Sequence, residues 1–203
     1  MVDITSLEDL EALYGEAPIN VYKKETDHLT GTYRQWIERA PFFAIASVGQ
    51  KGLDCSPRGD TAGSVLKVLN DRQIAIPDRR GNNRLDTLKN IIRDPRVGLL
   101  FLMPGVHETM RVIGRARITT DPDLINQFDM NGKKPATVIL VDIDAVHFQC
   151  ARAVKRANLW DTSTFANKSD VPTAGQMIAD AVDGFDGQSY DEALDERQKQ
   201  TLY

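Results

Sequence analysis

The chain has 203 residues, of which 41% are hydrophobic, and carries a formal net charge of −4 with a pI near 5.4. This length and apolar content suffice for one sizeable core. The acidic balance argues against non-specific nucleic-acid binding, which needs a dominant basic face. The sequence has no apolar run of about eighteen residues, and its acidic start is unlike a secretory signal. We therefore expect a cytoplasmic protein with no membrane partner.

Two amphipathic helices are predicted before the first strand. The first begins after Ser6, a capping-type residue, and its apolar face, from Leu7 to Tyr14, should pack on the body of the protein. The second covers about residues 32–39, where Tyr33 and Trp36 have the spacing of core residues.

Short apolar or alternating segments joined by turns predict at least six strands. They lie at residues 41–48, 53–58, 65–69, 73–77, 97–103, 110–118 and 137–143. Because most connections are too short for parallel crossovers, we predict a mainly β fold, an antiparallel barrel with helical additions.

A polar segment, Ser56 to Asp60, interrupts the strand pattern with a hydroxyl, a guanidinium, a glycine and a carboxylate. Such a break suits close approach by a ligand. The alternative is a β-bulge with a surface ion pair between Arg58 and Asp60.

A second polar segment, Asp78 to Arg84, carries three arginines, a glycine and two asparagines between a strand and a helix predicted at 85–94. Free N–H groups and the positive dipole end at a helix start favour an anion, so this segment predicts a phosphate cradle. The alternative is a solvated basic turn in which Asp78 or Asn83 caps the helix.

The two cysteines, Cys55 and Cys150, lack the spacing of metal ligands, so we expect no metal site and two free, buried thiols. His28, His107 and His147 have no recognisable nucleophile or ligand partner, and we interpret them as structural or exposed.

The chain is predicted to form one domain with three parts: N-terminal helices over 1–40, a core over 41–165 and an acidic tail over 166–203. The tail is rich in Asp and Glu and contains Gly184 and Gly187. It is either a solvated flap or an arm that faces a partner.

Four motifs in order resemble the split-barrel flavoproteins related to pyridoxamine 5′-phosphate oxidase. They are Ser-Pro-Arg-Gly-Asp at 56–60, Pro-Asp-Arg-x-Gly-Asn-Asn-Arg at 77–84, Pro-Gly at 104–105 and Arg-Val-x-Gly-Arg-Ala at 111–116. The similarity covers roughly residues 20–165. It implies an FMN-binding split barrel in which two subunits share the flavin site.

The resemblance also implies roles for individual residues. Arg79, Asn82 and Arg84 are the candidates for the FMN phosphate. Ser56, Arg58 and Asp60 are expected at the pyrimidine edge of the flavin ring, with the peptide of Pro77 and Asp78 against the ring. The remaining candidates are Thr109 and Arg111, which are expected to act on the partner subunit's flavin, and Trp160, which either covers the flavin or fills the core.

Departures from the best-known enzyme of this family concern the substrate. The segment that would grip pyridoxal phosphate is absent, and Gln149 stands where the most similar subgroup has a histidine. The sequence therefore predicts a homodimeric FMN oxidoreductase that uses another small-molecule substrate or electron donor. The alternative is a non-catalytic carrier or sensor of flavin, haem or deazaflavin.

Overall fold

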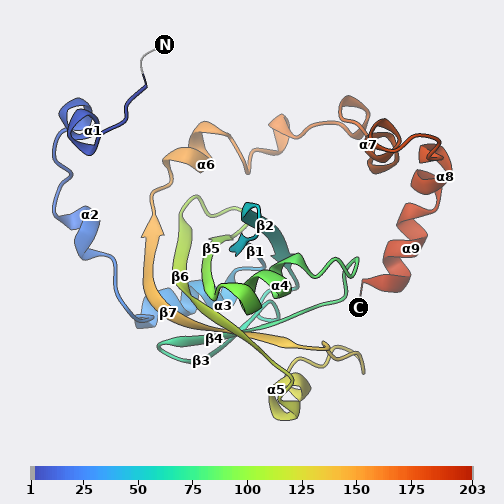
Figure 1. The fold of residues 1–203 in the computed structure, drawn as a ribbon, viewed down its shortest axis with the longest axis horizontal. Helices are drawn as coiled ribbons and strands as arrows, with labels where there is room; N and C mark the ends of the chain where they lie inside the picture. The colour runs from blue at the N-terminus through green and yellow to red at the C-terminus, as the bar shows by residue number, and fades with distance from the viewer. Residues whose placement is uncertain (1–2, 203) are drawn as a thin grey trace.

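The computed structural model describes residues 3–202 and contains a seven-stranded antiparallel sheet that curls into a barrel (Figure 1). The strand order is β2-β1-β5-β6-β7-β4-β3. The strands are β1 (Phe42–Gly49), β2 (Gly52–Gly59), β3 (Lys67–Asn70), β4 (Gln73–Pro77), β5 (Arg96–Leu102), β6 (Thr109–Thr119) and β7 (Val138–Gln149). This architecture confirms the predicted fold class, mainly β and antiparallel with helical additions.

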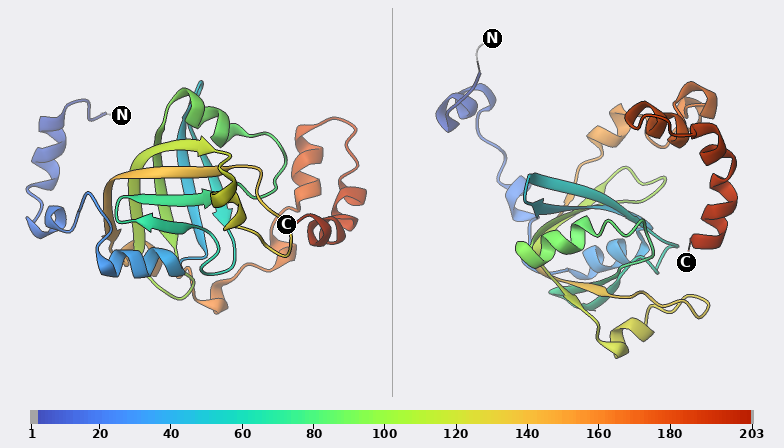
Figure 2. Two further views of the ribbon diagram at one scale, coloured as in Figure 1. Left: turned by 90° about the horizontal axis from the view of Figure 1, so that it is seen from below. Right: turned by 45° about the vertical axis from the view of Figure 1, so that its right-hand side comes forward.

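Nine α-helices accompany the sheet in the described residues. They are α1 (Leu7–Tyr14), α2 (Asn20–Lys23), α3 (Gly31–Arg39), α4 (Asp86–Arg93), α5 (Pro122–Asn126), α6 (Arg152–Arg156), α7 (Ala174–Ala181), α8 (Gly187–Glu192) and α9 (Leu194–Thr201). Helix α4 packs on β1, β2 and β6, whereas α7, α8 and α9 follow one another in an arm outside the barrel (Figure 2).

The core fills the barrel and follows the period-two pattern of the strands. Phe43 on β1 and Phe101 on β5 are both fully buried, with ring centroids 4.8 Å apart. Ile37 of α3 is also fully buried, and Tyr33 and Trp36 pack against the same cluster, as their spacing predicts. A smaller cluster forms where Phe128, after α5, packs against β4 and β7.

Strand β6 requires a glycine at one point. Its register with β7 shifts between Ile113 and Gly114, and a Cβ atom at Gly114 would lie 2.2 Å from the Asp142 carbonyl oxygen. A larger residue would force the strands apart, which gives a packing reason for the glycine in the 111–116 motif.

The break predicted at residues 56–60 lies further along the chain. Strand β2 runs through Gly59 and pairs with β1 without a register shift, so the β-bulge alternative is wrong. The irregular segment is residues 60–66, between β2 and β3. Ser56 and Arg58 are therefore held on a regular strand, with partly buried side chains that point to one face.

Two other expectations are wrong. Helix α1 forms after its Ser6 cap, but none of its residues is buried, and it stands away from the barrel (Figures 1 and 2). Cys55 and Cys150 are free, as expected, but both are exposed. Cys55 is exposed because the side of β2 on which it lies faces outward, a direction that depends on the sheet's long-range pairing.

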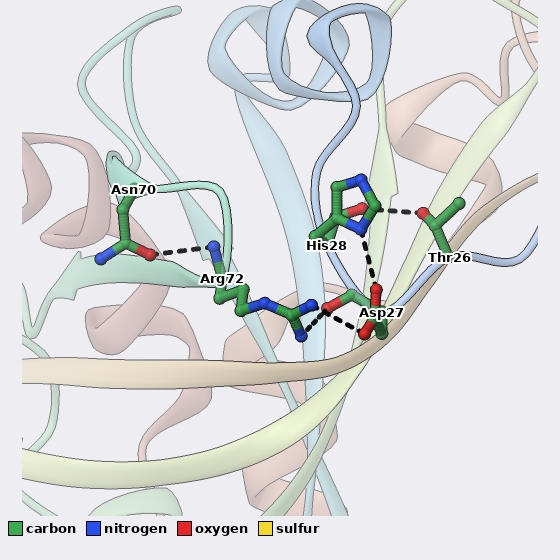
Figure 3. Close-up of polar contacts among 5 residues, drawn as sticks. All are labelled: Thr26, Asp27, His28, Asn70 and Arg72. Atoms are coloured by element: carbon green, nitrogen blue, oxygen red, sulfur yellow. Dashed lines mark hydrogen bonds and ion pairs between the residues drawn. The ribbon is translucent and has the colours of Figure 1, made fainter.

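A polar cluster fastens the segment before α3 to the turn between β3 and β4 (Figure 3). Arg72 donates to the Asp27 carboxylate at 2.8 Å and to the Asp27 carbonyl at 3.1 Å. Hydrogen bonds from His28 and Arg72 lower the pKa of Asp27 to about 2.

Among residues 3–202, no helix has both the length and the apolar content that crossing a membrane would require.

Candidate functional site

The main pocket brings the two polar motifs together. It has a volume of about 740 Å³ and three walls: residues 56–60, residues 77–88 and residues 134–137, with Val65 between them. Five cationic side chains and three carboxylates line it: Arg58, Arg79, Arg80, Arg84 and Lys134, with Asp60, Asp78 and Asp86. The volume suits a small cofactor, and the excess of cations favours an anionic one.

Arg79 links the first and second walls of the pocket. Its Nε donates to the Asp60 carboxylate at 3.0 Å, and its Nη1 donates to the Phe128 carbonyl at 2.7 Å. The side chains are 16% and 2% exposed for Arg79 and Asp60 respectively. A buried ion pair of this kind positions both motifs, so Arg79 has a structural role in addition to any contact with a ligand.

Arg58 and Asp78 face each other across the same pocket, with 3.9 Å between a guanidinium nitrogen and a carboxylate oxygen. Burial raises the pKa of Asp78 above its ordinary value of 3.8, and the charge of Arg58 opposes this shift. The carboxylate thus sits in an environment that disfavours its charge.

Asp78→Asn should make folding less dependent on pH. A raised pKa means that the folded protein holds this proton more tightly than the unfolded chain. The protonated Asp78 carboxyl therefore contributes to the free energy of unfolding below pH 3.8. This contribution is lost as the pH rises through the pKa that Asp78 has in the folded protein. The neutral variant should gain stability relative to the wild type between about pH 3 and pH 7, measured by urea unfolding. A constant difference across that range would contradict this account.

The start of α4 lies at the second wall. Its N-cap is Leu85, in the left-handed region with φ 60° and without a side-chain cap bond. Asn83 also has φ 60°, and Asn82 accepts a bond from the Arg84 backbone N–H at 3.1 Å. The alternative in which Asp78 or Asn83 caps this helix is therefore wrong. The first N–H groups of α4 have no side-chain cap, which suits an anion.

Sequence reasoning missed some of the pocket lining. Thr87 is buried, and its hydroxyl donates to the Ser56 hydroxyl at 3.3 Å. Thr87 and Asn90, three residues apart on α4, are polar residues on a buried face, a signal that could have identified Thr87. The third wall, Lys134 to Thr137, is held beside the pocket by the pairing of β4 with β7, which the bond from the Asp78 N–H to the Thr137 carbonyl at 3.0 Å extends. No local pattern reveals that contact.

Eight of the eleven predicted site residues line the main pocket, and three lie elsewhere. Thr109 and Arg111 are on β6, where Arg111 is exposed. His147, opposite Arg111, has a pKa lowered mainly by burial, which the Glu25 carboxylate opposes and the charges of Lys24 and Arg111 reinforce. Trp160 is half-buried and donates its indole N–H to the Val106 carbonyl at 2.7 Å. Contact of Thr109, Arg111 and Trp160 with a second subunit's flavin stays a prediction.

Gln149 has a definite neighbour. Its Oε1 lies 3.5 Å from the Thr109 hydroxyl, at the paired ends of β6 and β7. An amide can thus occupy the histidine position of the similar subgroup and still accept a bond from the adjacent hydroxyl.

Comparison with known proteins gives the family. The sequence model described as pyridoxamine 5′-phosphate oxidase matches residues 29–150. The chain belongs to the pyridoxamine 5′-phosphate oxidase family. The matched range contains the barrel and all three walls of the main pocket. No curated protein matches the sequence significantly.

This chain is similar over part of its length to several solved structures. A HupZ variant from Group A Streptococcus is 15% identical, with a TM-score of 0.49, over 59% of this chain and 98% of its own. A candidate pyridoxamine 5′-phosphate oxidase from Lactobacillus delbrueckii is 19% identical, with a TM-score of 0.46, over 60% and 94%. General Stress Protein 26 from Bacillus anthracis is 16% identical, with a TM-score of 0.43, over 57% and 89%.

Proposed function

We propose that this member of the pyridoxamine 5′-phosphate oxidase family is a homodimeric FMN flavoprotein that acts as an oxidoreductase. The observation that carries the proposal is the main pocket, which brings together two motifs that residues 61–76 separate in the sequence, and which five cationic side chains line. FMN supplies hydride chemistry when bound, and the protein supplies orientation and electrostatics.

The phosphate end of FMN fits the second wall of the pocket. The Arg84 side chain is 75% exposed and reaches the pocket next to Asn82. Charge-assisted bonds from a guanidinium suit a phosphate, and the uncapped N–H groups of α4 would add dipolar attraction. Arg79, which Asp60 and Phe128 already hold, contributes its positive charge from a fixed position.

The ring end of FMN fits the first wall. Ser56, Arg58 and Asp60 come from the end of β2 and the residue after it, so they face the ring's polar edge from one side. The Pro77 and Asp78 peptide would lie against the ring. Arg58 would favour negative charge that develops on the reduced flavin. In the proposed dimer, Thr109, Arg111 and Trp160 would approach the same flavin from the second subunit.

The absorption spectrum of the purified protein tests cofactor binding before any substrate is known. We expect a yellow protein with flavin absorption that releases FMN on denaturation, identified by its mass. A colourless protein that does not take up added FMN, or one that releases haem or a deazaflavin, would overturn the proposal.

A non-catalytic carrier or sensor remains the second candidate because neither His nor Cys is among the residues that line the main pocket. Among the described residues of the pocket, the most common catalytic proton donor, histidine, is therefore missing. Reduction of bound FMN by NADH or NADPH, followed by steady turnover with an acceptor, would favour the enzyme. Tightly bound flavin without turnover would favour the carrier.

The proposed homodimer accounts for an uncovered apolar face of the barrel. We call this the outer face, formed by outward-pointing residues of β2, β1 and β5: Leu53, Cys55, Pro57, Phe42, Ala44, Ala46 and Leu100. Leu53 is 83% exposed and Phe42 is 40% exposed. An apolar patch of this kind marks an interface, and a two-fold pair would cover it on both copies.

Sedimentation tests the dimer. We expect a species of twice 22.6 kDa at micromolar concentration. Because the proposed flavin site needs both subunits, dilution that separates them should also release FMN. A monomer that keeps its full flavin content would contradict the shared site.

We expect no useful oxidation of pyridoxamine or pyridoxine phosphate. A second phosphate beside that of FMN needs its own cations, and the segment that carries them in true oxidases is absent. Lys134 lines the pocket, but a lysine is a weaker substitute for a bidentate guanidinium. The measurement is pyridoxal phosphate formation in air by the FMN-loaded protein. Turnover of about one per second or faster would contradict this expectation.

A further inference from the structure

Helix α1 presents an apolar stripe that no other part of residues 3–202 covers. Leu7, Leu13 and Tyr14 are 71%, 68% and 82% exposed, and Leu10 is 41% exposed. The helix is well specified, because Ser6 accepts the Asp9 N–H at 3.1 Å and Gly15 ends it with φ 67°. A helix of eight residues is marginal in water unless its apolar face is packed. Helix α1 therefore needs a surface to pack on.

The outer face offers a groove for such a helix. A hollow of about 310 Å³ lies between β2, β1, β5 and β6, away from the main pocket. Its apolar lining includes Ala46, Val48, Leu53 and Ile113, and Gly98 lies in it without a side chain. This surface has the size and chemistry of a site for a few aliphatic side chains.

We propose that α1 of one copy of this chain docks in the outer-face groove of a second copy. The docking pairs two apolar surfaces that the single chain leaves exposed, as amphipathic helices do in apolar grooves. Charge supports the pairing: α1 carries Glu8, Asp9 and Glu11 and no Lys or Arg. Two cations, Arg96 and Arg115, and one carboxylate, Asp144, line the groove.

Arg115 is the cation expected to meet the acidic side of α1. Arg96 already binds the Asp94 carboxylate at 2.6 Å, so much of its charge is neutralised within its own chain. Arg115 is exposed on β6 opposite Arg96. An exposed contact of this kind contributes more to orientation than to affinity.

The attachment of the N-terminal segment favours exchange between copies. Lys24 is held through its carbonyl by the Tyr33 hydroxyl at 2.7 Å, and Thr26 exchanges two backbone bonds with Val146. From these anchors the chain leads α1 away from its own barrel (Figures 1 and 2). In a two-fold pair each copy gives one helix and receives one, so the dimer contains two such helix–groove contacts and buries twice the area of one. This docking would extend the proposed dimer interface on the same outer face, and it does not depend on FMN.

Cross-linking tests the docking with a cysteine that the chain already has. Cys55 is exposed on β2, opposite Ala46 of the groove. In full-length protein with Cys150→Ser, Leu10→Cys should form a disulfide with Cys55 of a second copy under mild oxidation. The product is a covalent dimer on a non-reducing gel. A disulfide requires Cα atoms within about 7 Å, so only close docking produces it quickly.

The matched control is Ala12→Cys in the same Cys150→Ser background, because residue 12 lies on the opposite side of α1. It should cross-link at least about tenfold more slowly. An internal disulfide, seen as loss of both thiols without a dimer band, would mean that α1 packs on its own barrel and would overturn the proposal. Equal rates for the two variants would also overturn it.

A second variant measures the contribution to association. Leu10→Asp should raise the dimer dissociation constant about tenfold or more, since buried apolar anchors dominate interfaces. Sedimentation gives the constant, and circular dichroism checks that the barrel remains folded. An unchanged constant would overturn the proposal. Because the readout is association and cross-linking, a protein that binds no flavin can still pass this test, so the two proposals can fail separately.

Discussion

Asp60→Ala is expected to lower the free energy of unfolding by about 3–5 kcal/mol, because it leaves the partner of a buried ion pair without its carboxylate. The Asp60 side chain is only 2% exposed and accepts the Arg79 Nε–H at 3.0 Å. It also accepts the Thr61 backbone N–H at 2.7 Å. Removing it opens the junction between the first and second walls of the pocket. Urea unfolding of the protein without added cofactor measures the loss directly.

Asp27→Ala is the matched control, since it also removes the carboxylate of an ion pair with an arginine. Asp27 and its partner Arg72 are 61% and 55% exposed, so water can replace the lost contact. We expect a much smaller loss of stability. If Asp60→Ala and Asp27→Ala cost the same, the Arg79–Asp60 pair does not hold the walls together.

The local pattern of the sequence predicts most of the elements. Helix α4 follows from the spacing of its apolar residues and from the stop at Asp94-Pro95, and strand β5 follows from an almost unbroken apolar run. Strand β6 keeps its predicted alternation from Met110 to Ile118. In each case the residues that determine the element are close in the chain, so the pattern within a short window of sequence is sufficient to predict the element.

The errors come from contacts between distant residues. The pattern of α1 predicts its stripe from Leu7 to Tyr14, but it does not reveal that the stripe lies exposed, away from the barrel. The exposure of Cys55 depends on which side of β2 faces the barrel. Residues 134–137 reach the main pocket through the pairing of β4 with β7, which no short segment encodes.

The candidate site likewise has parts that the local sequence predicts and parts that depend on contacts between distant residues. Ser56 to Asp60 and Pro77 to Arg84 were found because each motif is contiguous, and the fold then places them together. The Arg79–Phe128 bond could not be predicted, because Phe128 lies 49 residues away and is positioned by α5. Contributions from a second subunit, such as that expected of Arg111, depend on an interface that one chain does not contain.

Arg84→Ala is expected to weaken FMN binding by about 1.5–3 kcal/mol, the range for one charge-assisted bond to a phosphate. The Arg84 side chain is 75% exposed and holds Asp86 at 2.8 Å through its Nε. The other guanidinium nitrogens extend beyond that pair, so this residue can bind an anion without breaking a buried contact. Stability without FMN should change little, because the Arg84–Asp86 pair is exposed.

Titration with FMN and with riboflavin separates a phosphate contact from a general change in the pocket. Riboflavin lacks the phosphate, so its affinity should fall much less than that of FMN. Arg93→Ala is the matched control, since Arg93 is an exposed arginine in the last turn of α4 and is not among the residues that line the pocket. Its FMN affinity should stay near that of the wild type. Added salt should narrow the difference between Arg84→Ala and the wild type, because an exposed charge is screened. If riboflavin and FMN weaken equally in Arg84→Ala, then Arg84 does not contact the phosphate and the orientation proposed for FMN is wrong.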